Sequence, residues 1–164
     1  TTLYTTKTGG KTVFSTELRG AFSQEHYYTE EVPIFERLYL GGTGSFRGFD
    51  YRTISPKDRD EPIGGNILAF AGAEVSFPLV RLPNGPGYLD FLRGVVFTDW
   101  GTVVESGHDF GHFRWSAGFG FRINVLGLLS GGMNAPVSVD FGFPLKMQDD
   151  DERQTVHVGF DFGF

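Results

Sequence analysis

An arginine and two acidic residues carry the most specific chemistry in this sequence. Arg47 stands in the tetrapeptide Phe46-Arg47-Gly48-Phe49, inside a glycine-rich stretch with no strand or helix period. An arginine held between two aromatic residues suits a buried, two-pronged pairing with carboxylates. Glu74 and Asp99 are the candidate partners, because they lie on the polar faces of the next two predicted strands. These residues predict a structural ion-pair clamp, and the alternative is an exposed turn with a solvated arginine.

Other patterns that could support catalysis or bind a cofactor are weak. His108 and His112 in HDFGH could be a metal pair, but they lie in a polar loop without an apparent third ligand. The GxG within GGTGSFRG is not followed by a helix, which argues against a nucleotide or phosphate loop. Ser45 or Ser106 could act with His108 in a hydrolase, but no nucleophile elbow supports this. We therefore predict a protein with no enzymatic activity, no metal and no cofactor.

The elements that must position the clamp are strands, because period-two alternation is the dominant pattern. The final segment, TVHVGFDFGF, places Val156, Val158 and Phe160 on one face. His157 and Gly159 fall on the opposite face. The same alternation predicts a short strand over 3–7 and longer strands over 11–24, 65–77, 92–104, 113–125, 135–145 and 155–164. The longer strands span roughly nine to thirteen residues, the length of a tilted strand that crosses a membrane.

The composition favours an all-β, antiparallel transmembrane barrel. The 164 residues include 18 Phe and 24 Gly. Phe favours strands and Gly is depleted from ordinary ones, so this mixture indicates strands with one bulky apolar face and one small polar face. A soluble β-sandwich with a Phe-rich core is the alternative. The formal net charge of −6 argues against a nucleic-acid partner, and no apolar run is long enough for a transmembrane helix.

The connections between the predicted strands alternate in character, as in outer-membrane barrels. Residues 80–90 and 125–136 are Gly- and Pro-rich and are predicted to be turns. The acidic run Asp149–Glu152 is predicted to be a solvated loop, and the alternative is a contact with a divalent cation or lipopolysaccharide. The connection over residues 25–64, about forty residues, is too long for a neutral link, and its glycine and aromatic content argues against disorder. We predict that this loop folds back into the barrel lumen.

The stretch ERLYLGGTGSFRGF resembles the conserved loop of the BamA-type outer-membrane assembly factors, the bacterial surface antigen family. Their signature is a (V/F)RG(F/Y) tetrapeptide, matched by Phe46-Arg47-Gly48-Phe49. An F-x-D-x-G pattern in a later strand of the family is matched by Phe97, Asp99 and Gly101. The last strand resembles the terminal barrel signal, with His157, Gly159, Phe160, Phe162 and Phe164 at its defining positions. The connection after Asn124 is longer than the family's usual turn.

This resemblance implies that Glu74 and Asp99 hold the loop arginine inside the barrel. It also implies a sixteen-stranded barrel that follows periplasmic POTRA domains. Residues 1–164 would then be the C-terminal six to seven strands of that one barrel domain, without a POTRA domain. Six strands alone enclose too little space for such a loop, because barrel diameter grows with strand number. We expect a longer polypeptide, rather than a second chain, to complete the barrel.

The resemblance further implies an integral protein of the bacterial outer membrane. Its function would be that of a non-enzymatic insertase for nascent outer-membrane β-barrel proteins. Outer-membrane lipids and accessory lipoproteins of an assembly complex would be further partners. A weak seam at the last strand would receive the incoming strand by β-augmentation. The alternatives are a polypeptide translocator of the same superfamily, of the two-partner secretion or TamA-like type, and a passive porin or structural barrel.

Overall fold

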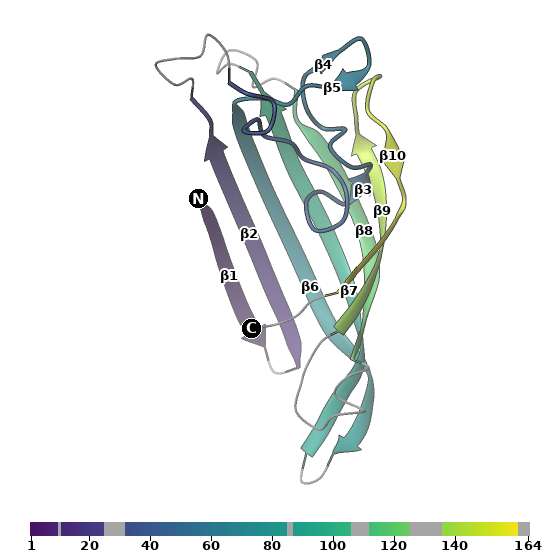
Figure 1. Ribbon diagram of the computed structural model, residues 1–164. Helices are drawn as coiled ribbons and strands as arrows, with labels where there is room; N and C mark the ends of the chain where they lie inside the picture. The colour runs from purple at the N-terminus through teal and green to yellow at the C-terminus, as the bar shows by residue number, and fades with distance from the viewer. Residues whose placement is uncertain (10, 25–31, 85–86, 106–111, 125–135, 161–164) are drawn as a thin grey trace.

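An antiparallel sheet, curved like part of a barrel wall, dominates the computed structural model (Figure 1). The structure describes residues 1–9, 11–24, 32–84, 87–105, 112–124 and 136–160. Within these ranges the sheet has seven strands in the order β1-β2-β6-β7-β8-β9-β11. Their bounds are β1 (Thr2–Gly9), β2 (Thr12–Phe22), β6 (Ile67–Asn84), β7 (Gly87–Val104), β8 (Arg114–Asn124), β9 (Pro136–Lys146) and β11 (Val156–Phe160).

Two short strand pairs lie outside this sheet. β3 (Gly48–Phe49) pairs with β10 (Arg153–Gln154). β4 (Lys57–Asp58) pairs with β5 (Glu61–Pro62). β3, β4 and β5 all belong to the connection between β2 and β6, and we call residues 32–66 of this connection the lumen loop. Residues 25–31 of the predicted loop lie outside the described residues.

The two faces of the sheet differ as the alternation predicted. On the convex face the large side chains are exposed; Phe160 of β11, for example, is 69% exposed. Trp100 and Trp115 stack on neighbouring strands of this face, with ring centroids 6.2 Å apart. On the concave face His157, also of β11, is 1% exposed. An apolar outer face with a polar inner face is the pattern of a membrane barrel wall, and the predicted all-β fold is confirmed.

The described residues contain no helix with the length and apolar character needed to span a membrane.

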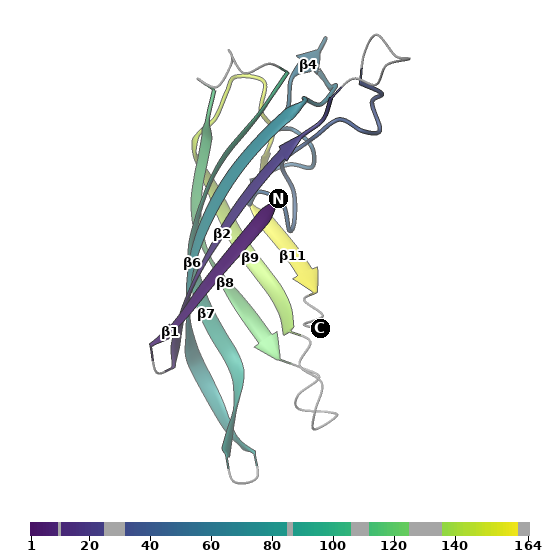
Figure 2. The same cartoon turned by 90° about the vertical axis from the view of Figure 1, so that its left-hand side faces the viewer.

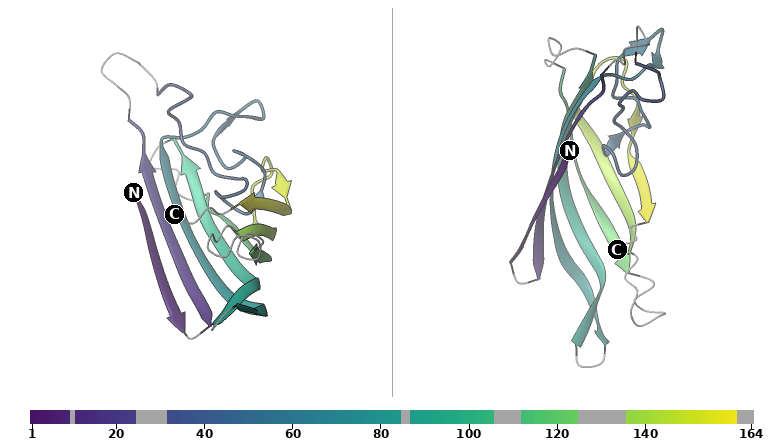
Figure 3. Two further views of the ribbon diagram at one scale, coloured as in Figure 1. Left: turned by 60° about the horizontal axis from the view of Figure 1, so that its bottom comes forward. Right: turned by 60° about the vertical axis from the view of Figure 1, so that its left-hand side comes forward.

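The hydrophobic core lies between the lumen loop and the concave face, and not between two sheets. Figures 2 and 3 show the wall bending around the loop. The loop contributes buried apolar side chains that pack on Phe70 of β6 and Val103 of β7. These loop residues are Leu40, Phe46, Phe49 and Ile54. Because the loop supplies most of this cluster, its position on the wall is determined by hydrophobic burial as well as by charge.

The predicted turn at residues 80–90 is wrong for most of its length. β6 and β7 continue as a two-stranded ribbon that projects beyond the other strands (Figure 2). Pro83 is tolerated there because a ribbon edge leaves backbone N–H groups without a required strand partner. Arg81 and Asp90 pair across the ribbon at 2.8 Å, and Arg93 reaches the same carboxylate at 2.6 Å. Pro83 and Gly87 therefore belong to an irregular ribbon, and residues 85–86 between the two strands lie outside the described residues.

The prediction that Asp149–Glu152 is a solvated loop is also wrong for one residue, Asp151. Asp151 is buried and forms an ion pair with Arg114 of β8. Its neighbours Asp149, Asp150 and Glu152 are exposed, as predicted for the run. A run of like charges is usually solvated, but a single buried arginine overrides this expectation at one position. The predicted turn at 125–136 falls almost entirely outside the described residues.

Candidate functional site

Arg47 forms a fork with Asp99 at the tip of the lumen loop. Its Nε and Nη2 atoms donate to the two carboxylate oxygens of Asp99, both at 2.9 Å. The Arg47 backbone N–H adds a third bond to the same carboxylate at 3.3 Å. The Asp99 side chain is 2% exposed. A bidentate pair of this kind fixes orientation as well as distance, because two parallel bonds allow only one arrangement of the two planar groups.

Glu74 completes the contact on the adjacent strand, β6. Its Oε2 accepts from Nη1 of Arg47 at 2.7 Å and lies 3.3 Å from Nη2 of Arg122 on β8. Arg122 in turn donates to Asp140 of β9 at 2.6 Å. The charges therefore alternate in sign from β7 through the loop to β9. This arrangement bridges four neighbouring strands of the wall through side chains alone.

The F-x-D-x-G pattern of β7 forms the floor of the site. The guanidinium carbon of Arg47 lies 3.5 Å from the ring centroid of Phe97. Asp99 follows on the same face. At Gly101 a side chain would come within 3.1 Å of both Leu40 and Phe46. The three positions of the pattern therefore act differently, since Phe97 supports the cation, Asp99 binds it, and Gly101 makes room for the loop core.

The structure corrects the predicted environment of Arg47. Phe46 and Phe49 do not sandwich the guanidinium but pack edge-to-face on each other, with centroids 5.1 Å apart. Both rings are fully buried in the core beneath the loop. Within this turn Phe46 enters the core, while Arg47 faces the charged residues. Phe97, on the wall, is the aromatic partner of the arginine.

Gly48 brings the loop into contact with the last strand. Its φ of +94° is accessible mainly to glycine. Its N–H donates to Nε2 of His157 on β11 at 2.8 Å, and Nδ1 of the same ring lies 3.4 Å from Oγ1 of Thr43. Nε2 acts as the acceptor, so this ring nitrogen carries no proton. The polar residue of the terminal strand therefore binds the lumen loop.

The guanidinium group of Arg47 stays protonated in the folded protein. Burial lowers the pKa of Arg47, but the hydrogen bonds and charges of Asp99, and then of Glu74, outweigh burial and raise it above its ordinary value. Because the folded pKa of Arg47 is raised, deprotonation of the guanidinium would weaken the clamp only in strong alkali. Arg47 thus keeps its positive charge at any pH that a cell tolerates.

The site supplies electrostatic positioning of the loop. Beside the loop tip lies a cavity of about 680 Å³ with charged walls. Its charged lining consists of Glu17, Arg19, Arg47, Glu74, Asp99, Arg122 and Asp140. Among the residues that the structure describes, no group of three or more His, Asp and Glu side chains is arranged to hold a metal ion.

The structure places most of the residues singled out from the sequence around one site. The tetrapeptide, the F-x-D-x-G residues, Glu74 and His157 meet at the loop tip, whereas Phe160 faces outward. Gly159 lies beside the loop, where an added side chain would come within 3.3 Å of Thr43. Phe162, Phe164 and His108 fall outside the described residues.

Three further residues of the site were missed from the sequence. Arg122 and Asp140 extend the charge network. Gly142 of β9 lies against the backbone of Gly48, and an added side chain would come within 2.8 Å of its Cα. All three lie on the small, polar faces that the alternation assigns to the lumen. The period-two alternation could therefore have identified these three residues as inward-facing, but it could not have shown which inward residues the loop would contact.

Known proteins share both this sequence and this fold. Residues 1–164 match the Omp85 superfamily domain. The outer membrane protein assembly factor BamA of Nitratidesulfovibrio vulgaris is 48% identical over 138 residues, which cover 81% of this chain and 16% of that protein. BamA of Neisseria meningitidis serogroup B is 31% identical over 153 residues, covering 77% of this chain and 18% of that protein.

Two further likenesses come from an animal protein and from a solved structure. The sorting and assembly machinery component 50 homolog B of Xenopus laevis is 27% identical over 128 residues, covering 72% of this chain and 26% of that protein. The crystal structure of BamA from Haemophilus ducreyi lacking POTRA domains 1–3 has a TM-score of 0.76 to this chain at 23% identity. This fold likeness covers 96% of the present chain and 32% of that chain.

These relatives are all much longer, and the chain spans less than a third of each. The resemblance to BamA-type proteins that the loop and strand motifs suggested is confirmed. The outer-membrane localisation is confirmed by the same relatives. With a family domain that matches from the first residue to the last, the chain belongs to the Omp85 superfamily.

Proposed function

We propose that this chain is the C-terminal part of an outer-membrane β-barrel assembly factor that acts as a non-enzymatic insertase. The assembly-factor names of its BamA relatives support the general function. The single observation that supports the mechanism is that one loop contacts both the wall and the edge strand. Arg47 binds β6 and β7, while the adjacent Gly48 binds β11.

The physical problem for an insertase is the unpaired edge of an incoming strand. Backbone N–H and C=O groups without partners are very costly in lipid. In the part of the chain that the structure describes, β1 and β11 are the two edges of the sheet. We infer that β11 lies at a seam of the complete barrel and lends its edge to the incoming strand by β-augmentation. The lumen loop would hold β11 in register while its outer edge is open.

The remainder of the barrel is part of this proposal. The curved sheet leaves its concave side open in Figure 3, and the lumen loop occupies that side. We infer that further strands of a longer polypeptide continue the sheet beyond β1 to a total of about sixteen, because barrel diameter grows with strand number. Outer-membrane lipids would contact the convex face, and accessory lipoproteins would bind other parts of the full protein.

The test uses the full-length protein reconstituted in lipid vesicles, with an unfolded outer-membrane barrel protein as the client. Insertion is followed by the heat-dependent gel mobility of the client and by its resistance to protease. Arg47→Ala removes the clamp and leaves Asp99 buried without its partner, which costs about 3–5 kcal/mol. We expect the insertion rate to fall at least roughly tenfold. Arg59→Ala, at an exposed turn of the same loop, is the matched control.

The same preparation separates this function from the alternatives. If Arg47→Ala and Arg47→Glu both insert the client at the wild-type rate, the clamp is not part of the mechanism. A passive porin would show a large and steady conductance in planar bilayers. A polypeptide translocator would pass a secreted chain into the vesicles and leave the barrel client uninserted.

A further inference from the structure

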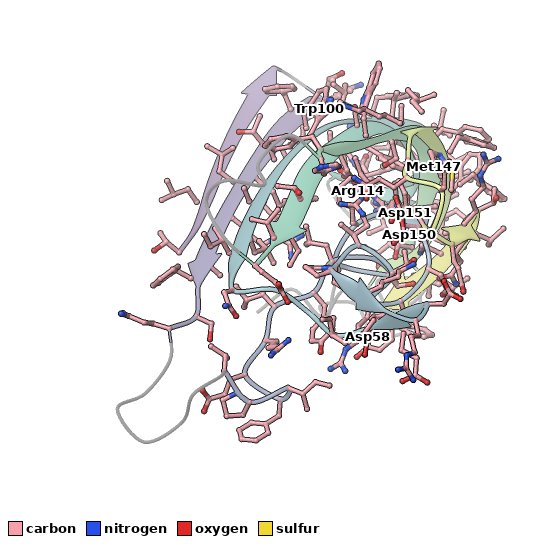
Figure 4. The ribbon with its side chains drawn as sticks, turned by 90° about the horizontal axis from the view of Figure 1, so that it is seen from above. Asp58, Trp100, Arg114, Met147, Asp150 and Asp151 are labelled. Atoms are coloured by element: carbon pink, nitrogen blue, oxygen red, sulfur yellow. The ribbon has the colours of Figure 1, made fainter. Side chains whose placement is uncertain are left out.

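A second attachment of the lumen loop lies well away from Arg47. Residues 147–154, which connect β9 to β11, bend over the loop and contact it along one arm. We call this segment the clasp. In the view from above, the labelled Arg114 and Asp151 lie inside the curve of the wall, whereas Trp100 lies at its outer side (Figure 4). The clasp therefore stands between the wall and the loop.

A buried ion pair joins the clasp to the wall. Nε and Nη2 of Arg114 donate to the two oxygens of Asp151, both at 3.0 Å. The two side chains are 3% and 0% exposed. The remaining donors of Arg114 reach Oε1 of Gln148 at 3.0 Å and the carbonyl of His112 at 3.1 Å. The backbone N–H of Gln148 donates to Asp151 at 2.7 Å, so the pair has further partners on both sides.

The clasp also binds the loop, mainly through backbone groups. β10 pairs with β3 of the loop, with Gln154 opposite Gly48. The N–H of Asp50 donates to the carbonyl of Glu152 at 3.0 Å, and the N–H of Glu152 donates to Oγ1 of Thr53 at 2.8 Å. Lys57 of the loop additionally contacts Asp150. The loop arm over residues 48–57 is thus attached to the clasp along its length.

The burial of the Arg114–Asp151 ion pair indicates that it positions the clasp. Two charges removed from water contribute little net stability, because desolvation offsets most of their attraction. Breaking such a pair is nevertheless strongly destabilising, since the remaining charge is left buried and unpaired. Only one arrangement of clasp and wall satisfies both groups. The pair therefore selects one position of the clasp, and through the backbone contacts one position of the loop arm.

We propose that Arg114 and Asp151 are positioning residues that keep the lumen loop and the last strand together as one unit. Acting through the clasp, they hold the loop arm against the β9–β11 hairpin while Arg47 holds the loop tip on β6 and β7. β11 then cannot leave its place without moving the loop. This inference rests on the proposed insertase function for its consequence, although the attachment itself is independent of that function.

The experiment compares Asp151→Asn with Asp149→Asn in the full-length protein. Both changes remove one negative charge from the clasp, but Asp149 is exposed. Amide hydrogen exchange is measured for residues 48–54, only on the folded species with heat-shifted mobility. Exchange in Asp151→Asn should be at least roughly tenfold faster than in wild type, because one charge of a buried pair is lost. Asp149→Asn should exchange like wild type.

Vesicle insertion of the barrel client supplies the second measurement. Asp151→Asn should slow insertion about fivefold or more, because the loop arm and the last strand no longer move together. Arg114→Lys keeps the charge and loses the fork, so its insertion rate should lie between that of Asp151→Asn and wild type. If Asp151→Asn fails to yield folded protein, the comparison of Arg114→Lys with Asp149→Asn decides by the same two measurements.

Each outcome decides one part of the inference. Unchanged exchange over residues 48–54 in the pair variants would overturn the attachment. Faster exchange with an unchanged insertion rate would mean that the ion pair attaches the loop but has no positioning role in insertion. If the wild-type protein inserts no client at all, the proposed function fails, whereas the exchange experiment still tests the attachment of the loop.

Discussion

Gly142 of β9 is the position at which one added methyl group should release the loop. In Gly142→Ala the new carbon would meet the backbone nitrogen of Gly48 first, and it would lie 2.8 Å from Cα of Gly48 and 2.9 Å from the carbonyl carbon of Arg47. All three neighbours are backbone atoms, so none can rotate away as a side chain would. Non-bonded carbon atoms prefer a separation of about 3.5 Å, so the loop must retreat by at least roughly 0.7 Å. The substitution changes no charge and removes no side-chain contact.

The expected free-energy cost follows from this displacement. A retreat of roughly 0.7 Å would stretch the bond between the Gly48 N–H and His157 from 2.8 Å to the limit of a hydrogen bond, with a loss of about 1 kcal/mol. Overpacking a well-packed site adds about 1–3 kcal/mol. A total cost of about 2–4 kcal/mol would raise the ratio of undocked to docked loop roughly 30- to 1000-fold over its wild-type value.

Amide hydrogen exchange of the folded, membrane-inserted protein measures this shift directly. Exchange over residues 46–50 should accelerate in Gly142→Ala, and exchange in β2 should not change. Gly20→Ala on β2 is the control, because no atom lies within 4 Å of the added carbon. Equal protection of residues 46–50 in Gly142→Ala and wild type would refute the close approach of loop and wall. Equal acceleration in Gly20→Ala would show that any added methyl group loosens the sheet.

Two further substitutions test the clamp and the strand contact. Asp99→Asn should destabilise loop docking more than Glu74→Gln, because the side chain of Asp99 is 2% exposed and that of Glu74 is 27% exposed; thermal shifts of heat-modifiable mobility rank the two variants, and the reverse order would contradict the assigned burial. His157→Leu removes the acceptor of the Gly48 N–H and should cost about 1–3 kcal/mol. His157→Gln retains an acceptor and should recover part of that loss, as measured by exchange at Gly48; equal losses would show that packing alone matters there.

The clamp was predictable because its signals are local or periodic. Strand parity places Glu74 and Asp99 on inward faces, and the tetrapeptide places Arg47 in a long glycine-rich loop. The contact of His157 with Gly48 was not predictable, because it joins positions 109 residues apart. The sequence pattern marks His157 only as a polar inward residue. The residues next to His157 in the sequence do not indicate that Gly48 is its partner.

The errors have one physical cause in common. Asp151 was assigned to solvent and residues 80–90 to a turn because both predictions used local composition. A buried arginine from another strand overrides an acidic run, and cross-strand pairing overrides a Gly- and Pro-rich segment. The orientation of Phe46 and Phe49 likewise depended on a core that only the folded loop creates.

The sequence by itself determined the strands apart from the ribbon at residues 80–90, the direction in which side chains on these strands point, and the residue types of the clamp. These follow from period-two alternation and from short motifs, which are properties of neighbouring residues. Tertiary structure alone decided which inward residues meet: Arg47 with Phe97, Gly48 with His157, and Arg114 with Asp151. Such pairings depend on how a long loop closes back onto a curved wall, and closure brings together positions that local sequence does not relate.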